Sequence, residues 1–144
     1  MAADCIFCSI VDGSIPSRTV YEDSETLAFL DANPLAPGHT LVIPREHYAR
    51  LDDLDASLAG SVLETLHELV EPVESAVEAD GSTVAFNNGP AAGQEIDHVH
   101  GHIIPRFDGD GGGPIHAVAG SPPELEESEL DSIAESITDS HDGE

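Results

Sequence analysis

The chain has 144 residues and a mass of 15.1 kDa, which suits one domain with one hydrophobic core. It contains 29 acidic residues but only four arginines and no lysine, which gives a formal net charge of -25. This charge argues against a nucleic-acid-binding protein, because phosphate neutralisation needs clustered Lys and Arg. The sequence predicts neither a membrane span nor a signal peptide, so we expect a cytoplasmic protein.

The acidic residues are distributed along the chain and are not confined to one tail. In molar salt the Debye length falls to about 3 Å or less, so the repulsion between carboxylates is screened. We therefore interpret the composition as that of a cytosolic protein from an extreme halophile.

The first elements predicted along the chain are a short helix and three strands. Residues 4–12 mix apolar and polar positions as a helix does, and a Gly and a Pro end it. Residues 19–22 and 26–31 are typical of a hairpin around an Asp-Ser turn. The segment GHTLVIPREH, residues 38–47, then predicts a third strand.

A long amphipathic helix is predicted from residue 53 to about residue 79. Its apolar residues recur at spacings of three and four, which places them on one face. Pro72 lies inside this stretch, and because an interior proline removes a backbone hydrogen bond we expect a bend there. The apolar stripe consists of Leu54, Leu58, Val62, Leu66, Leu69, Val73 and Val77.

Two more strands and a helix are predicted in the remaining sequence. Residues 82–89 and 98–106 form the fourth and fifth strands, and a Gly-rich loop covers residues 108–121. Residues 121–137 predict a capped acidic helix, after which the last few residues are expected to fray. Helices interspersed with hairpin-like strands predict an α+β fold with an antiparallel sheet.

The segment DHVHGHIIPR, residues 97–106, places His98, His100 and His102 at alternate positions. In a strand their side chains project from one face about 6.6 Å apart, and the intervening residues line the other face. Three such imidazoles could hold a zinc ion with an open fourth position, as in hydrolytic metal centres. Alternatively, one neutral imidazole could act as a nucleophile while its neighbours donate hydrogen bonds.

The preceding loop, NNGPAAGQEID, favours phosphorus chemistry. Its glycines let backbone N–H groups approach an anion, and its Asn and Gln side chains add neutral donors. A Gly-containing hairpin loop without a ligand is the alternative. The residues suited to a phosphate are Asn87, Gly89, Gly93 and Gln94.

Cys5 and Cys8 are the only cysteines and form a C-x-x-C pair. A disulfide is not expected for one such close pair in a domain that can bury its own core. The pair fits half of a zinc site, a redox pair or two small core residues, and partners elsewhere in the chain must decide between these.

The segment HVHGHII resembles the signature of the histidine-triad (HIT) family, whose members bind nucleotides and cleave at an α-phosphate. The likeness extends to CIFCSI, LAFLDANPLAPGHTLVIPREH and NNGPAAGQEIDHVHGHIIPR, which follow the family's order and spacing over roughly residues 4–107. It implies a HIT-like fold in residues 1–108, with a five-stranded antiparallel sheet, one long helix and short terminal helices. Residues 109–144 would form an acidic, Gly-rich loop and a C-terminal helix packed on or trailing this domain.

The resemblance implies roles for the catalytic candidates. His100 would attack the α-phosphorus, with its other ring nitrogen held by a main-chain carbonyl, and His102 and His39 would hydrogen-bond phosphate oxygens. Glu95 stands where eukaryotic branches carry Ser or Thr and would assist protonation of the leaving group. Gly101 replaces a bulky apolar residue of the family, so we expect weaker packing behind the strand.

The resemblance also implies a nucleotide pocket. Asp31 would accept the ribose hydroxyls. The phosphate would be lined by Asn87, Gly93, Gln94 and the Glu95 main chain. The base would lie among Ile6, Phe7, Ile10, Phe29 and Leu41. An apolar slot with a few fixed polar groups is typical of such sites.

Many prokaryotic HIT proteins are similar to this chain in having an N-terminal C-x-x-C and a histidine after IPR-x. Together with the first triad histidine, these residues hold a structural zinc. Here Cys5, Cys8, His47 and His98 would bind Zn2+ in a closed tetrahedron that pins the N-terminal helix to the sheet. No organic cofactor is expected.

The function implied is hydrolysis of purine nucleoside phosphoramidates or adenylates by a homodimer, with no nucleic-acid or membrane partner. His102 favours hydrolysis, because similar nucleotidyl transferases carry Gln at this position. A dinucleoside polyphosphate hydrolase is one alternative. The other is a nucleotide-binding or zinc-stabilised adaptor with little turnover.

We expect the fold to need salt on the order of molar, because few positive residues offset the negative charge when screening is removed. The melting temperature should therefore rise steeply with KCl concentration up to molar levels. A melting temperature that does not change with salt would contradict the halophile interpretation.

Overall fold

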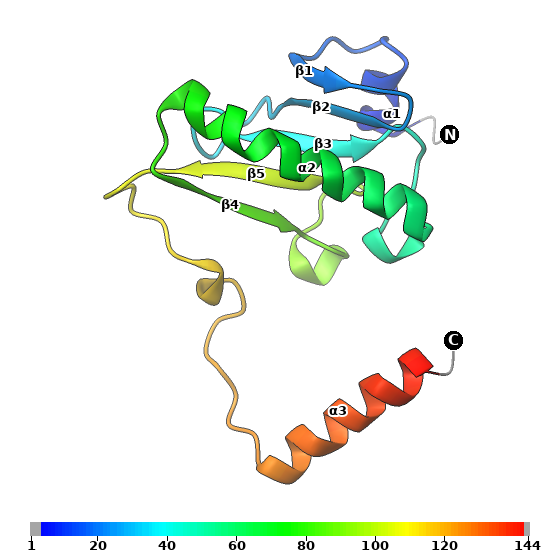
Figure 1. Cartoon of the computed structure of the whole chain (residues 1–144), viewed down its shortest axis with the longest axis vertical. Coiled ribbons are helices and arrows are strands. Elements are labelled where there is room, and N and C mark those ends of the chain that lie inside the picture. Colours follow the sequence, from blue (N-terminus) through cyan, green and yellow to red (C-terminus); the bar gives the residue numbers. More distant parts are fainter. Residues whose placement is uncertain (1–3, 143–144) are drawn as a thin grey trace. The chain divides into compact units, whose positions relative to one another are not determined.

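The computed structural model describes residues 4–142, and Figure 1 shows its helices and strands. Two compact units divide the chain after Gly112, and the second unit contains a single long helix. In chain order the elements are α1 (Ile6–Val11), β1 (Thr19–Glu22), β2 (Thr26–Leu30), β3 (Thr40–Pro44), α2 (Ala56–Val77), β4 (Gly81–Phe86), β5 (Gly101–Arg106) and α3 (Glu127–Asp142).

The first unit is built on one five-stranded sheet with the strand order β1-β2-β3-β5-β4. Every neighbouring pair of strands is antiparallel. Helix α2 lies across one face and contacts β2, β3, β4 and β5 (Figure 1). The predicted α+β fold, with an antiparallel sheet and one long helix, is confirmed.

The two faces of the sheet carry separate apolar clusters because strand side chains alternate. One cluster packs the sheet against α2 and includes Ala28, Val42, Val99 and Ile103. The other packs the opposite face against α1 and includes Phe7, Leu27, Phe29, Leu41 and Ile43. In the strand pairing Leu41 lies opposite His102, which places the histidines on the α1 face.

Helix α2 begins and ends with identifiable caps. The Asp55 side chain accepts a hydrogen bond from the Leu58 N–H at 2.8 Å, and Glu78 adopts the left-handed conformation that stops the helix. The predicted stripe faces the sheet, and Leu58, Val62, Leu66 and Val73 are buried. Pro72 lies inside the helix, which continues past it to Val77.

The predicted fifth strand is three residues too long at its start, since β5 begins at Gly101 and not at His98. The Val99 N–H donates to the Tyr48 carbonyl at 2.7 Å, so it is bonded to the loop after β3 and not to a strand. Pro44 ends β3 and has no N–H to continue the ladder. The expected alternation nevertheless holds, because Val99 and Ile103 belong to the α2-facing cluster.

Gly101 does not leave a gap behind the strand, so the expectation of weak packing was wrong. A Cβ at this position would lie 2.8 Å from Leu66 Cδ1 and 2.9 Å from Phe86 Cζ. These two side chains therefore occupy the space that a bulky residue would take. A larger residue here would require the Leu66 and Phe86 side chains to move.

The second unit contains α3, which begins at Glu127 and continues to Asp142. The predicted helix, residues 121–137, begins six residues before the observed start at Glu127. The residues after 137 were expected to fray, but they are helical as far as Asp142. Residues 143–144 lie outside the described part of the chain. Within residues 4–142, no helix has the length and apolar character needed to cross a membrane.

We expect Gly101→Val to reduce the free energy of unfolding by about 1–3 kcal/mol, because the added methyls would collide with Leu66 and Phe86. Gly81→Val is the matched control, since a Cβ at this strand glycine meets no atom within 4 Å. Combining Gly101→Val with Leu66→Ala should cost less than the sum of the two single changes. Urea denaturation measures all of these, and additivity in the double variant would contradict the packing explanation.

Candidate active site and metal site

The three alternating histidines lie on one face but use their ring nitrogens for different partners. His98 Nδ1 lies 3.4 Å from Cys5 Sγ, and His98 Nε2 lies 2.9 Å from the Pro44 carbonyl oxygen. His100 Nδ1 contacts the His98 carbonyl at 2.8 Å, and His102 Nδ1 lies 3.0 Å from His39 Nε2. This arrangement does not support the alternative of one zinc ion shared by the three strand histidines.

His100 is held in a single orientation. A carbonyl oxygen can only accept a hydrogen bond, so His100 Nδ1 donates to the His98 carbonyl and carries a proton. In the neutral imidazole Nε2 then keeps its lone pair. The Phe7 ring packs edge-on against the imidazole, with centroids 5.1 Å apart and planes at 86°. Nε2 is therefore the nitrogen available for nucleophilic attack.

His39 and His102 form a buried pair beside His100. Their ring centroids lie 5.2 Å apart, and those of His100 and His102 lie 5.0 Å apart. Burial lowers the pKa of His102 to about 4 and also lowers the pKa of His39. Asp31, which follows β2, lies near the pair, with Oδ2 3.7 Å from His39 Nε2. Both imidazoles are thus neutral near pH 7.

The loop before the histidines is shaped by the side-chain amide of Gln94. Its Oε1 accepts a hydrogen bond from the Gly89 N–H at 2.8 Å, and its Nε2 donates to the Ala49 and Ile96 carbonyls at 2.6 and 2.9 Å. The amide is occupied in bracing the loop. Asn87 is exposed, and its Nδ2 lies 3.9 Å from where a Cβ on Gly93 would be. Asn87 is therefore the exposed amide of this loop, whereas the Gln94 amide is already hydrogen-bonded.

Two residues that brace this loop were missed from the sequence. Asn88 Oδ1 accepts from the Leu51 N–H at 2.9 Å, and Asn88 Nδ2 donates to Asp52 at 3.1 Å. The Arg50 guanidinium leaves no room for a Cβ at Gly89, where φ is +93°. In the sequence, the only sign of this arrangement is the pair of Asn residues in NNG. The pair does not show that Asn87 is exposed while Asn88 is hydrogen-bonded to Leu51 and Asp52.

The residues expected around the base differ in exposure. Phe7, Phe29 and Leu41 are buried in the α1-facing cluster, Ile10 is half-buried, and Ile6 is 45% exposed. Phe7 joins this apolar cluster to His100. Glu95 is exposed. Burial leaves Ile6 and Ile10 as the apolar side chains of this set that a ligand can reach without rearrangement.

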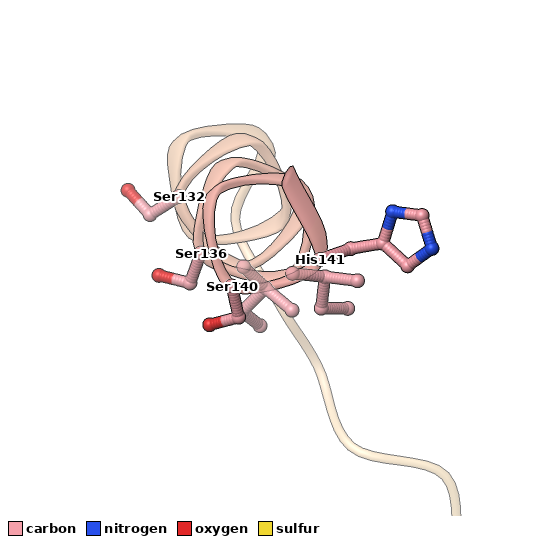
Figure 2. A pocket seen from close by; sticks show the side chains of 6 residues that line it. Ser132, Ser136, Ser140 and His141 are labelled. Carbon is pink, nitrogen blue, oxygen red and sulfur yellow. The ribbon is translucent and has the colours of Figure 1, made fainter. Parts of the chain in front are cut away.

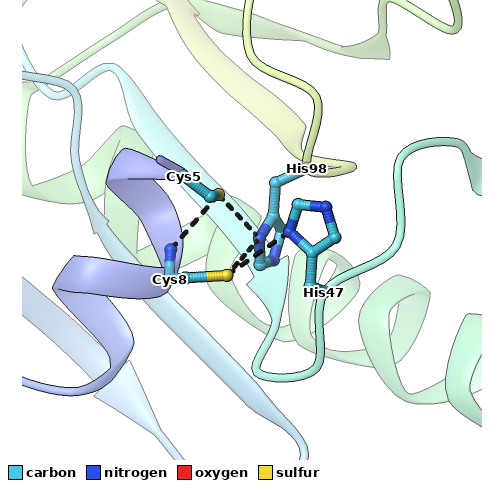
Figure 3. A group of neighbouring side chains, drawn as sticks. All are labelled: Cys5, Cys8, His47 and His98. Atoms are coloured by element: carbon cyan, nitrogen blue, oxygen red, sulfur yellow. Dashed lines mark hydrogen bonds between the residues drawn. The ribbon is translucent and has the colours of Figure 1, made fainter. Parts of the chain in front are cut away.

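A second group of side chains brings four possible metal ligands together, and Figure 3 shows them as sticks: Cys5, Cys8, His47 and His98. Cys8 Sγ lies 3.3 Å from His47 Nδ1 and 3.7 Å from His98 Nδ1. Tetrahedral zinc, with bonds of about 2.3 Å to sulfur and 2.0–2.1 Å to nitrogen, separates S and N ligands by about 3.6 Å. The observed separations therefore fit zinc.

His98 is also prepared for a metal by its other contacts. Burial lowers its pKa to about 4, so the imidazole is in the neutral form that binds metals. Its Nε2 donates to the Pro44 carbonyl, which leaves the Nδ1 lone pair directed at the thiols. The sequence predicted this group of four as ligands, and the structure brings them together.

A shallow hollow on α3 is lined by Ser132, Ile133, Ser136, Ile137, Ser140 and His141 (Figure 2). A single helix supplies its whole lining. Binding pockets enclose a ligand between several elements with convergent polar groups, which this hollow lacks. It contains no residue of either site described above.

The family model for the HIT domain matches residues 12–109. The chain belongs to the HIT family. A HIT-like protein of Methanocaldococcus jannaschii is 48% identical over 107 residues, which cover 74% of this chain and 82% of that protein. The adenosine 5'-monophosphoramidase of Schizosaccharomyces pombe is 44% identical over 102 residues, which cover 71% of this chain and 74% of the enzyme.

Solved structures share the HIT fold. One from Streptococcus mutans superposes with a TM-score of 0.87 at 36% identity and covers 97% of this chain and 87% of that chain. A Zn-bound histidine triad family protein from Mycobacterium smegmatis has a TM-score of 0.71 at 30% identity, with 98% of both chains covered. The predicted HIT-like fold is therefore confirmed.

Proposed function

We propose that this HIT protein is a hydrolase that cleaves at the α-phosphate of purine nucleoside phosphoramidates or adenylates. The observation that carries the proposal is His100, whose Nδ1 is held by the His98 carbonyl while Nε2 keeps its lone pair. A similar chain, that of Schizosaccharomyces pombe, is an adenosine 5'-monophosphoramidase, which supports this substrate class. The triad and the Asn-Gly loop supply the nucleophile and the neutral donors that such a reaction needs.

The reaction proceeds in two displacements. His100 Nε2 attacks the α-phosphorus, a P–N bond to the imidazole forms, and the bond to the leaving amine or acyl oxygen breaks. The leaving group takes a proton, for which the exposed Glu95 is the candidate donor. Water then attacks the phosphorus and gives a proton to the Glu95 carboxylate, the P–N bond to His100 breaks, and the nucleoside monophosphate is released.

Neighbouring residues orient the nucleotide in this proposal. His102 and His39, which pair at 3.0 Å, would hydrogen-bond phosphate oxygens, and Asn87 with the Gly93 backbone would line the phosphate. Asp31 is 22% exposed and accepts the ribose hydroxyls. Its Oδ1 is already held by the Asn33 N–H at 2.9 Å, which fixes the carboxylate.

We also propose that Cys5, Cys8, His47 and His98 hold a structural zinc ion. A zinc ion bound by four protein ligands has no open position for substrate, so it supplies stability and not chemistry. These ligands join α1, the loop after β3 and the segment two residues before His100. The Zn-bound relative from Mycobacterium smegmatis supports this assignment.

A homodimer belongs to the same proposal. Strand β4 is an edge of the sheet, with its outer backbone groups open to pairing. Val84 in β4 is 43% exposed and Leu63 in α2 is 50% exposed. Pairing of two protomers through such edges would give one continuous sheet and cover these side chains.

His100→Ala should lose about 10³-fold or more of kcat on adenosine phosphoramidate, because the covalent path is removed, while AMP binding changes by no more than a few-fold. His102→Ala should lose less, and His67→Ala, at an exposed histidine of α2, should keep full activity. Mass spectrometry of rapidly mixed wild-type protein should find one AMP on residue 100. The mechanism is wrong if His100→Ala keeps activity within a few-fold or if turnover follows added zinc.

The substrate class is tested by incubation with adenosine phosphoramidate and diadenosine polyphosphates side by side at high salt. Faster AMP release from the phosphoramidate is expected. A preference for the dinucleotides would instead identify a dinucleoside polyphosphate hydrolase. Binding of AMP without turnover of either compound would identify an adaptor.

Elemental analysis of metal-repleted protein should find about one zinc per protomer. Cys5→Ser and His47→Ala should lower the melting temperature and the zinc content more than they lower kcat, since the proposed ion does not touch the substrate. His116→Ala, at an exposed histidine outside both sites, is the control. Absence of zinc from the wild type, or full stability of Cys5→Ser, would remove the assignment.

A further inference from the structure

The proton positions in the His39–His102 pair follow from one backbone contact. The Leu35 N–H donates to His39 Nδ1 at 3.1 Å. A nitrogen that accepts a hydrogen bond carries no proton, so this contact excludes the protonated imidazolium and the Nδ1–H form of His39. His39 is therefore neutral, with its proton on Nε2.

The same argument extends to His102. His39 Nε2 lies 3.0 Å from His102 Nδ1, and because His39 is the donor, His102 Nδ1 is the acceptor. Burial and the neighbouring His100 and His39 hold the pKa of His102 well below its ordinary value, and Asp31 opposes this shift only in part. In neutral His102 the proton is consequently on Nε2.

His102 Nε2 is the one buried side-chain nitrogen or oxygen that lacks a hydrogen-bond partner within residues 4–142. Buried polar groups in native proteins almost always have partners, and a donor without one is costly to bury. The tautomer argument identifies this atom as an N–H. It therefore requires an acceptor, which the negatively charged oxygen of a bound phosphoryl group supplies.

We propose that His39 is a positioning residue that locks His102 in the Nε2–H tautomer, so that His102 donates this hydrogen bond to a phosphoryl oxygen of the substrate. The inference rests on the proposed function, and it assigns different roles to His39 and His102, for which the family resemblance implies the same role. Both ring nitrogens of His39 are hydrogen-bonded within the protein: Nδ1 accepts from the Leu35 N–H, and Nε2 donates to His102 Nδ1.

The tautomer of His102 in the His39–His102 pair is opposite to that of His100, the proposed nucleophile. His100 carries its proton on Nδ1 and offers a lone pair at Nε2, whereas His102 carries its proton on Nε2. The two rings lie 5.0 Å apart between centroids. Neighbouring imidazoles of opposite tautomer thus present a nucleophile and a hydrogen-bond donor to one phosphorus centre.

The test is a long-range proton–nitrogen NMR correlation on the full-length, zinc-loaded protein with and without AMP. His102 should give the Nε2–H pattern and His100 the Nδ1–H pattern, and the His102 Nε2 proton should move downfield when AMP binds. This readout needs no turnover, so it stands or fails independently of the hydrolase assignment. A His102 spectrum of the Nδ1–H form would overturn the proposal.

Variants of His39 separate positioning from a merely structural role. His39→Leu should leave His102 as a mixture of tautomers and lower kcat by about 10²-fold with KM within a few-fold. His39→Gln, whose amide can still donate to His102 Nδ1, should restore the Nε2–H form and most of the activity. If His39→Leu folds and keeps the single Nε2–H tautomer, or if it raises KM alone, His39 does not act through His102. The wild-type spectrum remains decisive if His39→Leu does not fold.

Discussion

The contacts of His98 are the constraint on which the active-site segment depends. Its Nε2 donates to the Pro44 carbonyl at the end of β3, its Nδ1 faces the two thiols beside α1, and its own carbonyl accepts from His100. One residue therefore ties the N-terminal helix to the sheet and fixes the tautomer of His100, the proposed nucleophile. Two contacts, Cys5 Sγ with His98 Nδ1 and the His98 carbonyl with His100 Nδ1, therefore connect α1 to His100.

The sheet separates packing from chemistry by its two faces. Val99 and Ile103 pack against α2, while His98, His100 and His102 lie on the face covered by α1. A slip of one residue in β5 would exchange the two sets. Gly101 disfavours this slip, since a Cβ at its position would lie 2.8 Å from Leu66 Cδ1 and 2.9 Å from Phe86 Cζ, so both side chains would have to move. The glycine at this position thus favours the register that places the three histidines on the α1 face.

Periodicity in the sequence was enough to predict the α+β class, the stripe of α2 and the alternation of the triad. It was not enough for the start of β5, because Val99 is held by the Tyr48 carbonyl, and a carbonyl carries no residue signature. The same limit applies to the Leu35 N–H that orients His39. The sequence identified Gln94 as a polar residue in a Gly-rich loop. It did not reveal that the Gln94 amide is hydrogen-bonded to the backbone of Gly89, Ala49 and Ile96. Contacts to backbone groups became visible only in the fold, and so did side-chain contacts without a repeating pattern, such as that of Asn88 with Asp52.

The neutrality of the proposed site is compatible with binding of a phosphate by so acidic a chain. Three of the four arginines lie beside carboxylates: Arg45 beside Glu22, Arg50 beside Asp52 and Arg106 beside Asp110. The donors near His100 are instead neutral imidazoles, an amide and backbone N–H groups, which act over hydrogen-bond distances and lose little to screening by salt. Long-range repulsion from the carboxylates acts over a Debye length, which falls to about 3 Å in molar salt. If the protein works in such salt, as its charge predicts, the repulsion is removed while the hydrogen bonds of the site remain. Charged lysines would lose their advantage under those conditions, and a phosphate site built from neutral donors keeps its strength.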